Sequence, residues 1–236
     1  MIRIQDLQFG YALARSTNQP QFRLQIPLWE VPDAARVAIV GPSGSGKTTL
    51  LHLLAGIMVP QQGQIEVGQY RLTEMTDAAR RDFRASQVGL VFQRFELIEY
   101  LNVARNILIP YSINRSLRLD DSVRRRMEHL AEQVGLTHLL HRPVQRLSQG
   151  EQQRVAICRA LITQPSWLLA DEPTGNLDPV NKRRIVDLLH QQAEASQATL
   201  IMVTHDVSLI EKFTHTVDFQ KWCPEVTAGS HVEASS

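Results

Sequence analysis

Cysteine and long hydrophobic runs are scarce in this chain of 236 residues. Its two cysteines, Cys158 and Cys223, are too few for a disulfide framework and lack metal-ligand spacing, which favours a reducing compartment. The apolar runs fall far short of the ~18 residues that a membrane span needs. The first residues contain no basic start followed by an apolar stretch. We therefore expect neither a membrane span nor a secretion signal.

An excess of charge of one sign is also absent. Lys and Arg total 25 against 24 Asp and Glu, so the formal net charge is +1 and no global field attracts nucleic acid or anionic lipid. Residues 71–130 carry 11 Arg against 8 acidic residues, and a solvated face of mixed charge is the simplest interpretation. The hydrophobic share of 43% allows a sizeable core. The length indicates one large domain, or a core with a small inserted lobe.

Short apolar runs rich in branched residues alternate with longer helical patterns. This alternation predicts an α/β fold with a mostly parallel sheet covered by helices. The clearest buried strands are expected at residues 36–40, 88–92, 167–170 and 199–203. Residues 2–7 and 22–28 alternate apolar and polar side chains, which is typical of antiparallel strands with one solvated face. Residues 16–20 are expected to form a turn or loop between them.

The strand signals fade from about residue 102 to residue 146, and we expect a helical subdomain over about 95–160, inserted in the α/β core. Within it, apolar residues recur at helical spacing: Val123, Met127, Leu130 and Val134. Asp121 and Ser122 are the candidate N-caps of that helix. The expected organisation is a single domain over residues 1–221 and a flexible C-terminal tail over 222–236.

A glycine-rich loop follows the apolar run at residues 37–40 and opens a helical pattern. The loop reads Gly41-Pro42-Ser43-Gly44-Ser45-Gly46-Lys47-Thr48-Thr49. This is the strand, loop and helix context that a phosphate-binding loop requires, because the glycines let backbone N–H groups wrap a polyphosphate beside a helix N-terminus. Lys47 supplies a cation for the outer phosphates and Thr48 a hydroxyl for Mg²⁺. The alternative is a glycine turn before a helix, and the loop alone does not separate kinases, GTPases and transport ATPases.

Two adjacent acids end the apolar run at residues 167–170. A buried parallel strand brings its last side chains to the carboxyl edge of the sheet, where ligands bind. Neighbouring side chains on a strand point to opposite sides, so Asp171 and Glu172 need different tasks. Asp171 is placed to hold Mg²⁺, directly or through water, and Glu172 to polarise the water that attacks the γ-phosphate. The alternative is a strand that merely ends in two surface acids.

A second anion-binding position is indicated at residues 147–154, Leu-Ser-Gln-Gly-Glu-Gln-Gln-Arg, which open another helical pattern. Here the sequence resembles the ATP-binding-cassette ATPases, whose signature is usually Leu-Ser-Gly-Gly-Gln and which sandwich two nucleotides between head-to-tail subunits. The resemblance covers about residues 1–213. It implies that Ser148 and Gly150 of one subunit close over the γ-phosphate held by the other. Gln149 and Glu151 depart from the usual signature, and Glu151 is expected to favour the helix dipole but could oppose a nearby γ-phosphate.

The same resemblance implies roles for four further motifs, and the motifs occur along the chain in the family's order. Gln93 would contact the metal or the attacking water and report to the membrane subunit. His205 would hydrogen-bond the γ-phosphate. Residues 176–178, Asn-Leu-Asp, look like the loop that spans the dimer interface. Tyr11 is the first candidate for the aromatic ring that stacks on adenine and Phe9 the second, although an isolated aromatic is more often part of the core.

The resemblance implies an ATP-binding and ATP-hydrolysing subunit that powers a separate membrane permease through head-to-tail dimerisation. Such a protein is cytoplasmic and peripheral on the inner face of the cell membrane, uses ATP and Mg²⁺, and pairs with a second ATPase subunit, as a homodimer. The helical lobe and the Gln93 loop would form the docking surface for the permease, and no nucleic-acid partner is expected. Residues 80–84, 101–107 and 172–178 look like the branch that serves lipoprotein release, macrolide export and related cell-division complexes. Amino-acid importers use similar segments.

Two other functions compete. A soluble cassette ATPase could act on nucleic acid or ribosomes, but such relatives usually carry long coiled-coil insertions or two cassettes, and neither occurs here. A phosphotransferase could use the same glycine-rich loop, but the motifs at Ser148 and His205 disfavour it.

Residues 215–223 fit the family pattern poorly. His138 and His141 are interpreted as surface or packing residues, and Cys158 as a small buried hydrophobe.

Overall fold

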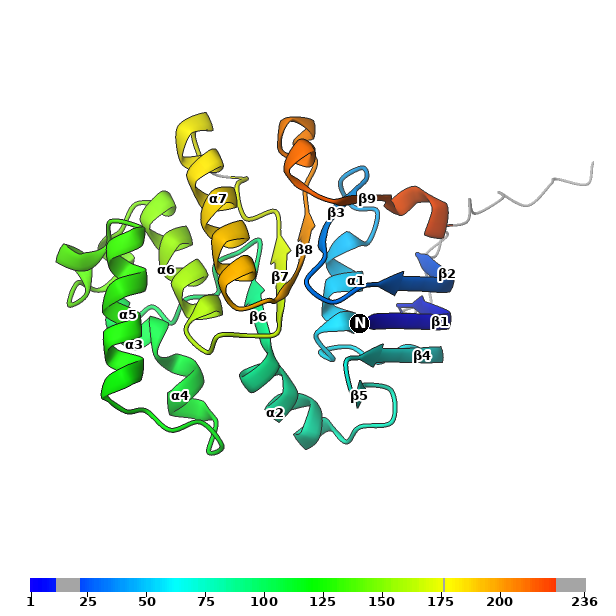
Figure 1. Ribbon diagram of the computed structural model, residues 1–236, viewed down its shortest axis with the longest axis horizontal. Helices are drawn as coiled ribbons and strands as arrows, with labels where there is room; N and C mark the ends of the chain where they lie inside the picture. Colours follow the sequence, from blue (N-terminus) through cyan, green and yellow to red (C-terminus); the bar gives the residue numbers. More distant parts are fainter. Residues whose placement is uncertain (12–21, 176, 224–236) are drawn as a thin grey trace, which may run out of the picture.

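The computed structural model describes residues 1–11, 22–175 and 177–223. The expected turn at residues 16–20, Asn176 and residues 224–236 lie outside the described part. Two sheets and their covering helices form one body, with the antiparallel sheet on one side, the parallel sheet in the middle and the helical lobe on the other side (Figure 1). Within the described residues, no helix is both long and apolar enough to cross a membrane.

The central sheet is parallel, as the sequence predicts, and its strand order is β6-β7-β8-β3-β9. The strands are β3 (Arg36–Val40), β6 (Val88–Val91), β7 (Trp167–Asp171), β8 (Thr199–Val203) and β9 (His215–Asp218). Two of them, β3 and β8, have the predicted bounds, whereas β6 ends one residue earlier and β7 one residue later than predicted. Every residue of β7 and β8 is buried, because helices and the second sheet cover both faces.

The second sheet is antiparallel, with the order β2-β1-β4-β5. It consists of β1 (Ile2–Gly10), β2 (Arg23–Val31), β4 (Gln62–Val67) and β5 (Tyr70–Arg71). The predicted pairing of the first two strands is confirmed, and both run three residues further than the alternation indicated. Their inward side chains pack on α1 (Lys47–Leu54), which lies between the two sheets (Figure 1).

The two faces of the central sheet belong to two separate hydrophobic clusters. On β7, Leu169 faces the cluster that contains α1 and the antiparallel sheet, whereas Leu168 and Ala170 face the cluster of the helical lobe. Helix α7 (Pro179–Ala195) joins this second cluster, and α2 (Asp77–Gln87) leads from the antiparallel sheet to β6. Because of this alternation, neighbouring side chains at the end of β7 point to opposite faces of the sheet and lie in different surroundings.

The helical lobe contains α3 (Val103–Ile107), α4 (Ile109–Ile113), α5 (Asp121–Gln133) and α6 (Gln149–Leu161), with short 3₁₀ turns at Thr137–Leu139 and Val144–Arg146. The apolar residues Val123, Met127 and Leu130 are buried as their spacing indicates. The predicted caps of α5 require correction. Asp120, one residue earlier, is the N-cap, and its carboxylate accepts a hydrogen bond from the Val123 N–H at 3.0 Å.

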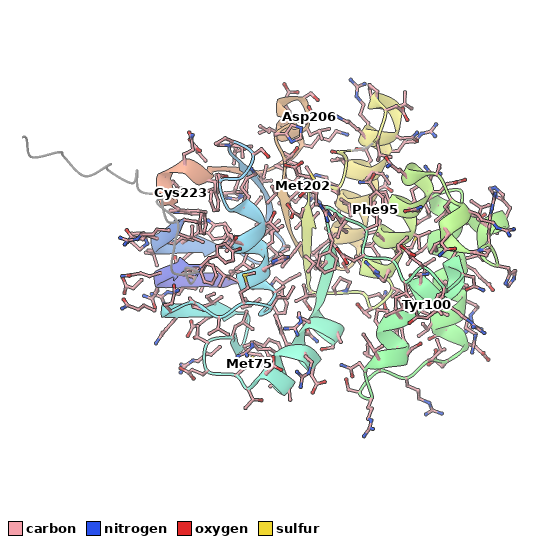
Figure 2. The ribbon with its side chains drawn as sticks, turned by 180° about the vertical axis from the view of Figure 1, so that it is seen from behind. Met75, Phe95, Tyr100, Met202, Asp206 and Cys223 are labelled. Atoms are coloured by element: carbon pink, nitrogen blue, oxygen red, sulfur yellow. The ribbon has the colours of Figure 1, made fainter. Side chains whose placement is uncertain are left out.

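The C-terminal part of the described chain covers an edge of the protein. After the 3₁₀ helix Val207–Lys212, β9 pairs with β3 at the sheet edge, and a turn at Phe219–Trp222 follows. Trp222 is 4% exposed and its ring centroid lies 5.0 Å from that of Trp29. Trp222 therefore belongs to the domain and not to the expected tail. Cys223 lies beside the antiparallel strands (Figure 2), and its thiol is 3.3 Å from the Ser45 carbonyl oxygen.

Candidate nucleotide-binding site

A cavity of about 320 Å³ lies where the carboxyl ends of the central strands meet the start of α1. Its lining brings together ten of the predicted site residues: Tyr11, Ser43, Gly44, Gly46, Lys47, Thr48, Thr49, Gln93, Asp171 and Glu172. Phe22 also lines the cavity, and nothing in the sequence singles out this residue beyond its place at the start of a strand pattern. The remaining predicted residues lie outside the cavity lining.

The glycine-rich loop depends on backbone conformations that only glycine adopts easily. Gly44 and Gly46 have φ values of +76° and +101°. A Cβ atom on Gly46 would lie 2.2 Å from the Phe22 ring, so any side chain there would collide with it. Gly46 is also the N-cap of α1 and offers no side chain to the first helical N–H groups. These N–H groups therefore remain available to an anion at the helix N-terminus.

Lys47 is a buried cation, only 5% exposed. Its ammonium donates hydrogen bonds to the carbonyl oxygens of Gly41 at 2.9 Å and Pro42 at 2.7 Å. Gly41 thus acts on the site through Lys47, since it does not line the cavity itself. The loop holds the cation at the place where the phosphates of a nucleotide would enter.

Thr48 and Asp171 meet on the cavity wall although 123 positions separate them. The Thr48 hydroxyl donates to the Asp171 carboxylate at 2.7 Å. Asp171 is 5% exposed, and this burial raises the pKa of its carboxyl group, with the charge of Glu172 adding to the effect and the Thr48 hydrogen bond opposing it. A hydroxyl, a carboxylate and the nearby Gln93 amide oxygen are the hard oxygen ligands that Mg²⁺ prefers, so these residues fit such an ion.

Glu172 lies beside His205, at the end of the neighbouring strand. The distance from His205 Nδ1 to Glu172 Oε1 is 3.3 Å. The Glu172 side chain is 17% exposed and that of His205 is 63% exposed. Glu172 has a φ of +45°, which is uncommon for a residue with a side chain, and its N–H donates to the Val203 carbonyl oxygen at 3.1 Å. The backbone thus turns the carboxylate of Glu172 away from β7 and toward the histidine.

Tyr11 closes one side of the cavity. Its hydroxyl is 2.7 Å from Thr49 Oγ1, and its ring packs edge-on against Phe9 with centroids 5.2 Å apart. The ring of Phe22 lies 5.7 Å from that of Tyr11. Tyr11 keeps 48% of its surface exposed, so part of an aromatic wall remains open beside the glycine-rich loop. Phe9 packs against the core and does not line the cavity.

Ser148 and Gly150 lie elsewhere, at the start of α6. Ser148 is the N-cap, and a capping box forms because its N–H donates to Glu151 Oε2 at 2.7 Å and its hydroxyl oxygen accepts from the Glu151 N–H at 3.3 Å. The Ser148 hydroxyl also donates to Glu151 Oε2, at 2.8 Å. These hydrogen bonds lower the pKa of the Glu151 carboxyl group. A Cβ on Gly150 would lie 3.3 Å from the Leu177 side chain, so the start of α6 contacts the segment that follows Glu172.

One residue near the site was not predicted. Gln153, on the same helix as Ser148, is 2% exposed, and its side-chain amide donates to the carbonyl oxygen of Pro173. Pro173 follows Glu172 directly. The sequence places Gln153 within a helical pattern but contains no signal that its side chain reaches this loop.

A parallel sheet with a glycine-rich loop before a helix, a buried lysine and a strand that ends in two acids defines a P-loop nucleotide-binding protein. Comparison with known proteins identifies the group more closely. The profile of the ABC transporter family matches residues 25–175, and the chain belongs to this family.

Among similar proteins, the lipoprotein-releasing system ATP-binding protein LolD 2 of Rhodopirellula baltica is 42% identical over 178 residues, which cover 74% of this chain and 70% of that protein. LolD of Rhodopseudomonas palustris is 34% identical over 220 residues, or 93% of each chain. A solved dimer of the ATP-binding cassette MJ0796, in a post-hydrolysis state with ADP and Pi, has a TM-score of 0.83 at 27% identity and covers 93% of this chain and 95% of its own. These findings confirm the predicted family, the α/β P-loop fold and an ATP-binding ATPase.

Proposed function

We propose that this chain is the motor subunit of a transporter of the lipoprotein-releasing type, which pairs with a second copy and drives a separate membrane permease from the inner face of the membrane. The observation that carries the proposal is the division of the predicted site. One set of residues surrounds a cavity, whereas Ser148 and Gly150 stand at a helix start outside its lining. A second copy of the chain, turned head to tail, would bring its Ser148 to the open side of this cavity.

Hydrolysis is assigned to the residues around Glu172. The phosphates of ATP would bind to the loop N–H groups and Lys47, with the adenine against the Tyr11 ring. Glu172 would accept a proton from the attacking water. His205 would hold the Glu172 carboxylate in place through Nδ1, which is 3.3 Å from it, and would reach the γ-phosphate through Nε2. Thr48, Asp171 and Gln93 would hold Mg²⁺, which when bound offsets the negative charge of the phosphates.

The surface proposed for the permease is a groove between α2 and α4, with a cavity volume of about 1080 Å³. Phe92, next to Gln93, lines it together with apolar residues of both helices, and Ile113 there is 74% exposed. Four arginines line the groove, against the single acid Asp82: Arg81, Arg84, Arg115 and Arg159. This charge balance favours a permease segment with an apolar face and acidic side chains.

The central experiment measures the size of the Glu172→Gln protein in solution with and without Mg-ATP. Removing the base should leave ATP binding intact and abolish turnover, so the dimer should accumulate with ATP and dissociate when ATP is removed. Glu128→Gln, on the exposed surface of α5, is the matched control and should hydrolyse ATP normally. A Glu172→Gln protein that stays monomeric at saturating ATP would contradict the paired arrangement. Unchanged turnover would remove Glu172 as the base.

A second experiment addresses the partner. The doubly charge-reversed variant Arg81→Glu, Arg115→Glu changes two exposed arginines of the groove, and it should retain ATP binding but lose most co-purification with membrane protein. Arg124→Glu, Arg125→Glu on α5 is the control, since neither residue lines the groove. ATPase activity stimulated by DNA or ribosomes, with no membrane protein retained, would favour a soluble cassette ATPase instead.

A further inference from the structure

A buried side-chain amide joins the helix that begins at Ser148 to the loop that carries Glu172. Gln153 lies five positions after Ser148 on α6, and its Nε2 donates to the carbonyl oxygen of Pro173. The side chain is 2% exposed, so the hydrogen bond is shielded from water. Among the described residues, no other side chain of α6 forms a hydrogen bond with this loop.

The bond acts on a backbone that needs support. Glu172 has a left-handed φ of +45°, which surrounding contacts must hold in place for a residue with a side chain. Its N–H donates to Val203 and its carbonyl oxygen accepts from the Gly175 N–H at 3.1 Å. The next carbonyl group along the chain, that of Pro173, accepts from Gln153. Gln153 therefore holds the Pro173–Thr174 peptide, one peptide plane beyond the two that flank Glu172, and so restrains the loop that carries the Glu172 carboxylate.

Packing alone does not explain a glutamine at this position. The Oε1 atom of Gln153 is buried and has no hydrogen-bond partner among the described residues. Burying an unpaired acceptor disfavours folding, and a methionine of similar size would fill the same space without that cost. The residue type is explained if the donated hydrogen bond to Pro173 is what the site requires.

We infer that Gln153 is a positioning residue, which couples the placement of the Ser148 helix to the orientation of the Glu172 carboxylate. When the start of α6 moves onto a nucleotide held by a second copy, the Pro173 carbonyl moves with it, and the base is aligned only in the closed pair. The inference rests on the proposed function, because it needs the start of α6 to engage a nucleotide.

The test compares Gln153→Met and Gln153→Leu with the full-length wild-type protein in steady-state ATPase assays. Both variants fill a similar volume with an apolar side chain, and neither can donate a hydrogen bond to Pro173. We expect kcat to fall about tenfold in each, with the KM for ATP changed less than twofold and the melting temperature of Gln153→Met unchanged or higher. Gln192→Met makes the same change at a side-chain amide on α7 whose one hydrogen bond within the described residues is to Gln133, and it should keep wild-type kinetics.

A further pair of measurements separates this inference from the proposed function. The double variant Gln153→Met, Glu172→Gln should pair with ATP as well as Glu172→Gln does, because Gln153 orients the base and does not grip the nucleotide. If Glu172→Gln pairs but Gln153→Met keeps the wild-type kcat, the inference is wrong. A loss of kcat with a raised KM and a lower melting temperature would show a purely structural role and would also overturn it. Failure of Glu172→Gln to pair would instead refute the proposed function.

Discussion

The cavity wall and the start of α6 are built differently. In the cavity, Lys47 bonds within its own loop, but other contacts join distant parts of the chain, since Thr48 bonds to Asp171 and Tyr11 to Thr49. At the start of α6, Ser148 bonds to a residue only three positions away, Glu151. One region is therefore assembled by the tertiary fold, and the other is completed by its own helix.

This difference shows which of the two regions is already arranged to bind a nucleotide. Lys47 and Asp171 are each 5% exposed, so the cavity holds its charges in fixed, shielded places. Ser148 is exposed, and its hydroxyl must exchange Glu151 for any phosphate that it contacts. We expect substitutions in the cavity to abolish function and substitutions at the helix start to tune it.

The largest effect is expected for Lys47→Ala. The substitution removes a buried cation from the phosphate position, so the affinity for ATP should fall by ~100-fold, equivalent to about 2.7 kcal/mol. Fluorescence titration with a labelled ATP analogue measures this. Lys221→Ala, which removes an exposed cation beside the Trp222 ring, is the control and should bind ATP within twofold of wild type. Binding by Lys47→Ala at wild-type affinity would show that the cavity is not the nucleotide site.

Asp171→Asn should lower activity and raise stability together. The amide keeps an oxygen for the Thr48 hydroxyl but loses the charge that suits Mg²⁺, so kcat should fall by about 100-fold. Burial raises the pKa of Asp171 above its unfolded value, and the ionised carboxylate therefore disfavours folding above that pKa. Neutralising it should raise the melting temperature by ~2–4 °C at pH 7. A melting temperature that falls would mean that the carboxylate stabilises the cavity.

Glu151→Gln should have a smaller effect than the two cavity substitutions, and it should strengthen pairing where they weaken function. Glutamine also completes a capping box, so α6 should keep its N-cap while losing a negative charge near the expected γ-phosphate. The ATP concentration for half-maximal pairing of Glu151→Gln, measured in the Glu172→Gln background, should fall about 2–5-fold. Glu132→Gln, exposed at the end of α5, is the control. Weaker pairing would show that Glu151 aids the contact instead of opposing it.

Much of the cavity could be predicted because its residues are determined by local pattern. A buried parallel strand needs a run of apolar residues, which gave the bounds of β3 and β8, and the ends of such strands deliver Asp171 and His205 to one edge of the sheet. The glycine-rich loop was predictable because its conformations exclude other residues at Gly44 and Gly46. These features are properties of short segments, and a sequence displays them directly.

The features that sequence reasoning missed are contacts between segments. Phe22 lies against Gly46, and Gln153 bonds to Pro173, yet neither pair is close in sequence. The predicted tail includes Trp222 because residues 215–223 fit the family pattern poorly, although Trp222 packs against Trp29 and is buried. The cap of α5 was misplaced because three successive polar residues all favour an N-cap, and only the backbone geometry selects Asp120.

The smallest effect concerns the helix α7, which begins seven residues after Glu172. His190 on α7 packs edge-on against Phe213, with centroids 4.8 Å apart, and its Nε2 is buried without a partner among the described residues. Burial, followed by the charges of Arg36 and Lys212, lowers its pKa to about 4 from a usual 6.5. The unfolded chain thus binds more protons between these values, and the fold should lose stability as the pH falls through this window.

Because the His190 ring is only half-buried, solvent screening limits the loss of unfolding free energy to about 1 kcal/mol at pH 5 relative to pH 7. His190→Phe keeps the ring contact with Phe213 and removes the titrating group, so its unfolding free energy should vary less over this range. His129→Gln, exposed on α5, should keep the wild-type pH dependence. If His190→Phe and wild type lose stability in parallel between pH 7 and pH 5, the acid sensitivity arises elsewhere. Pairing assays of Glu151 variants should therefore be run above pH 6.5. There the fold keeps its full stability, and the variants differ only at the start of α6.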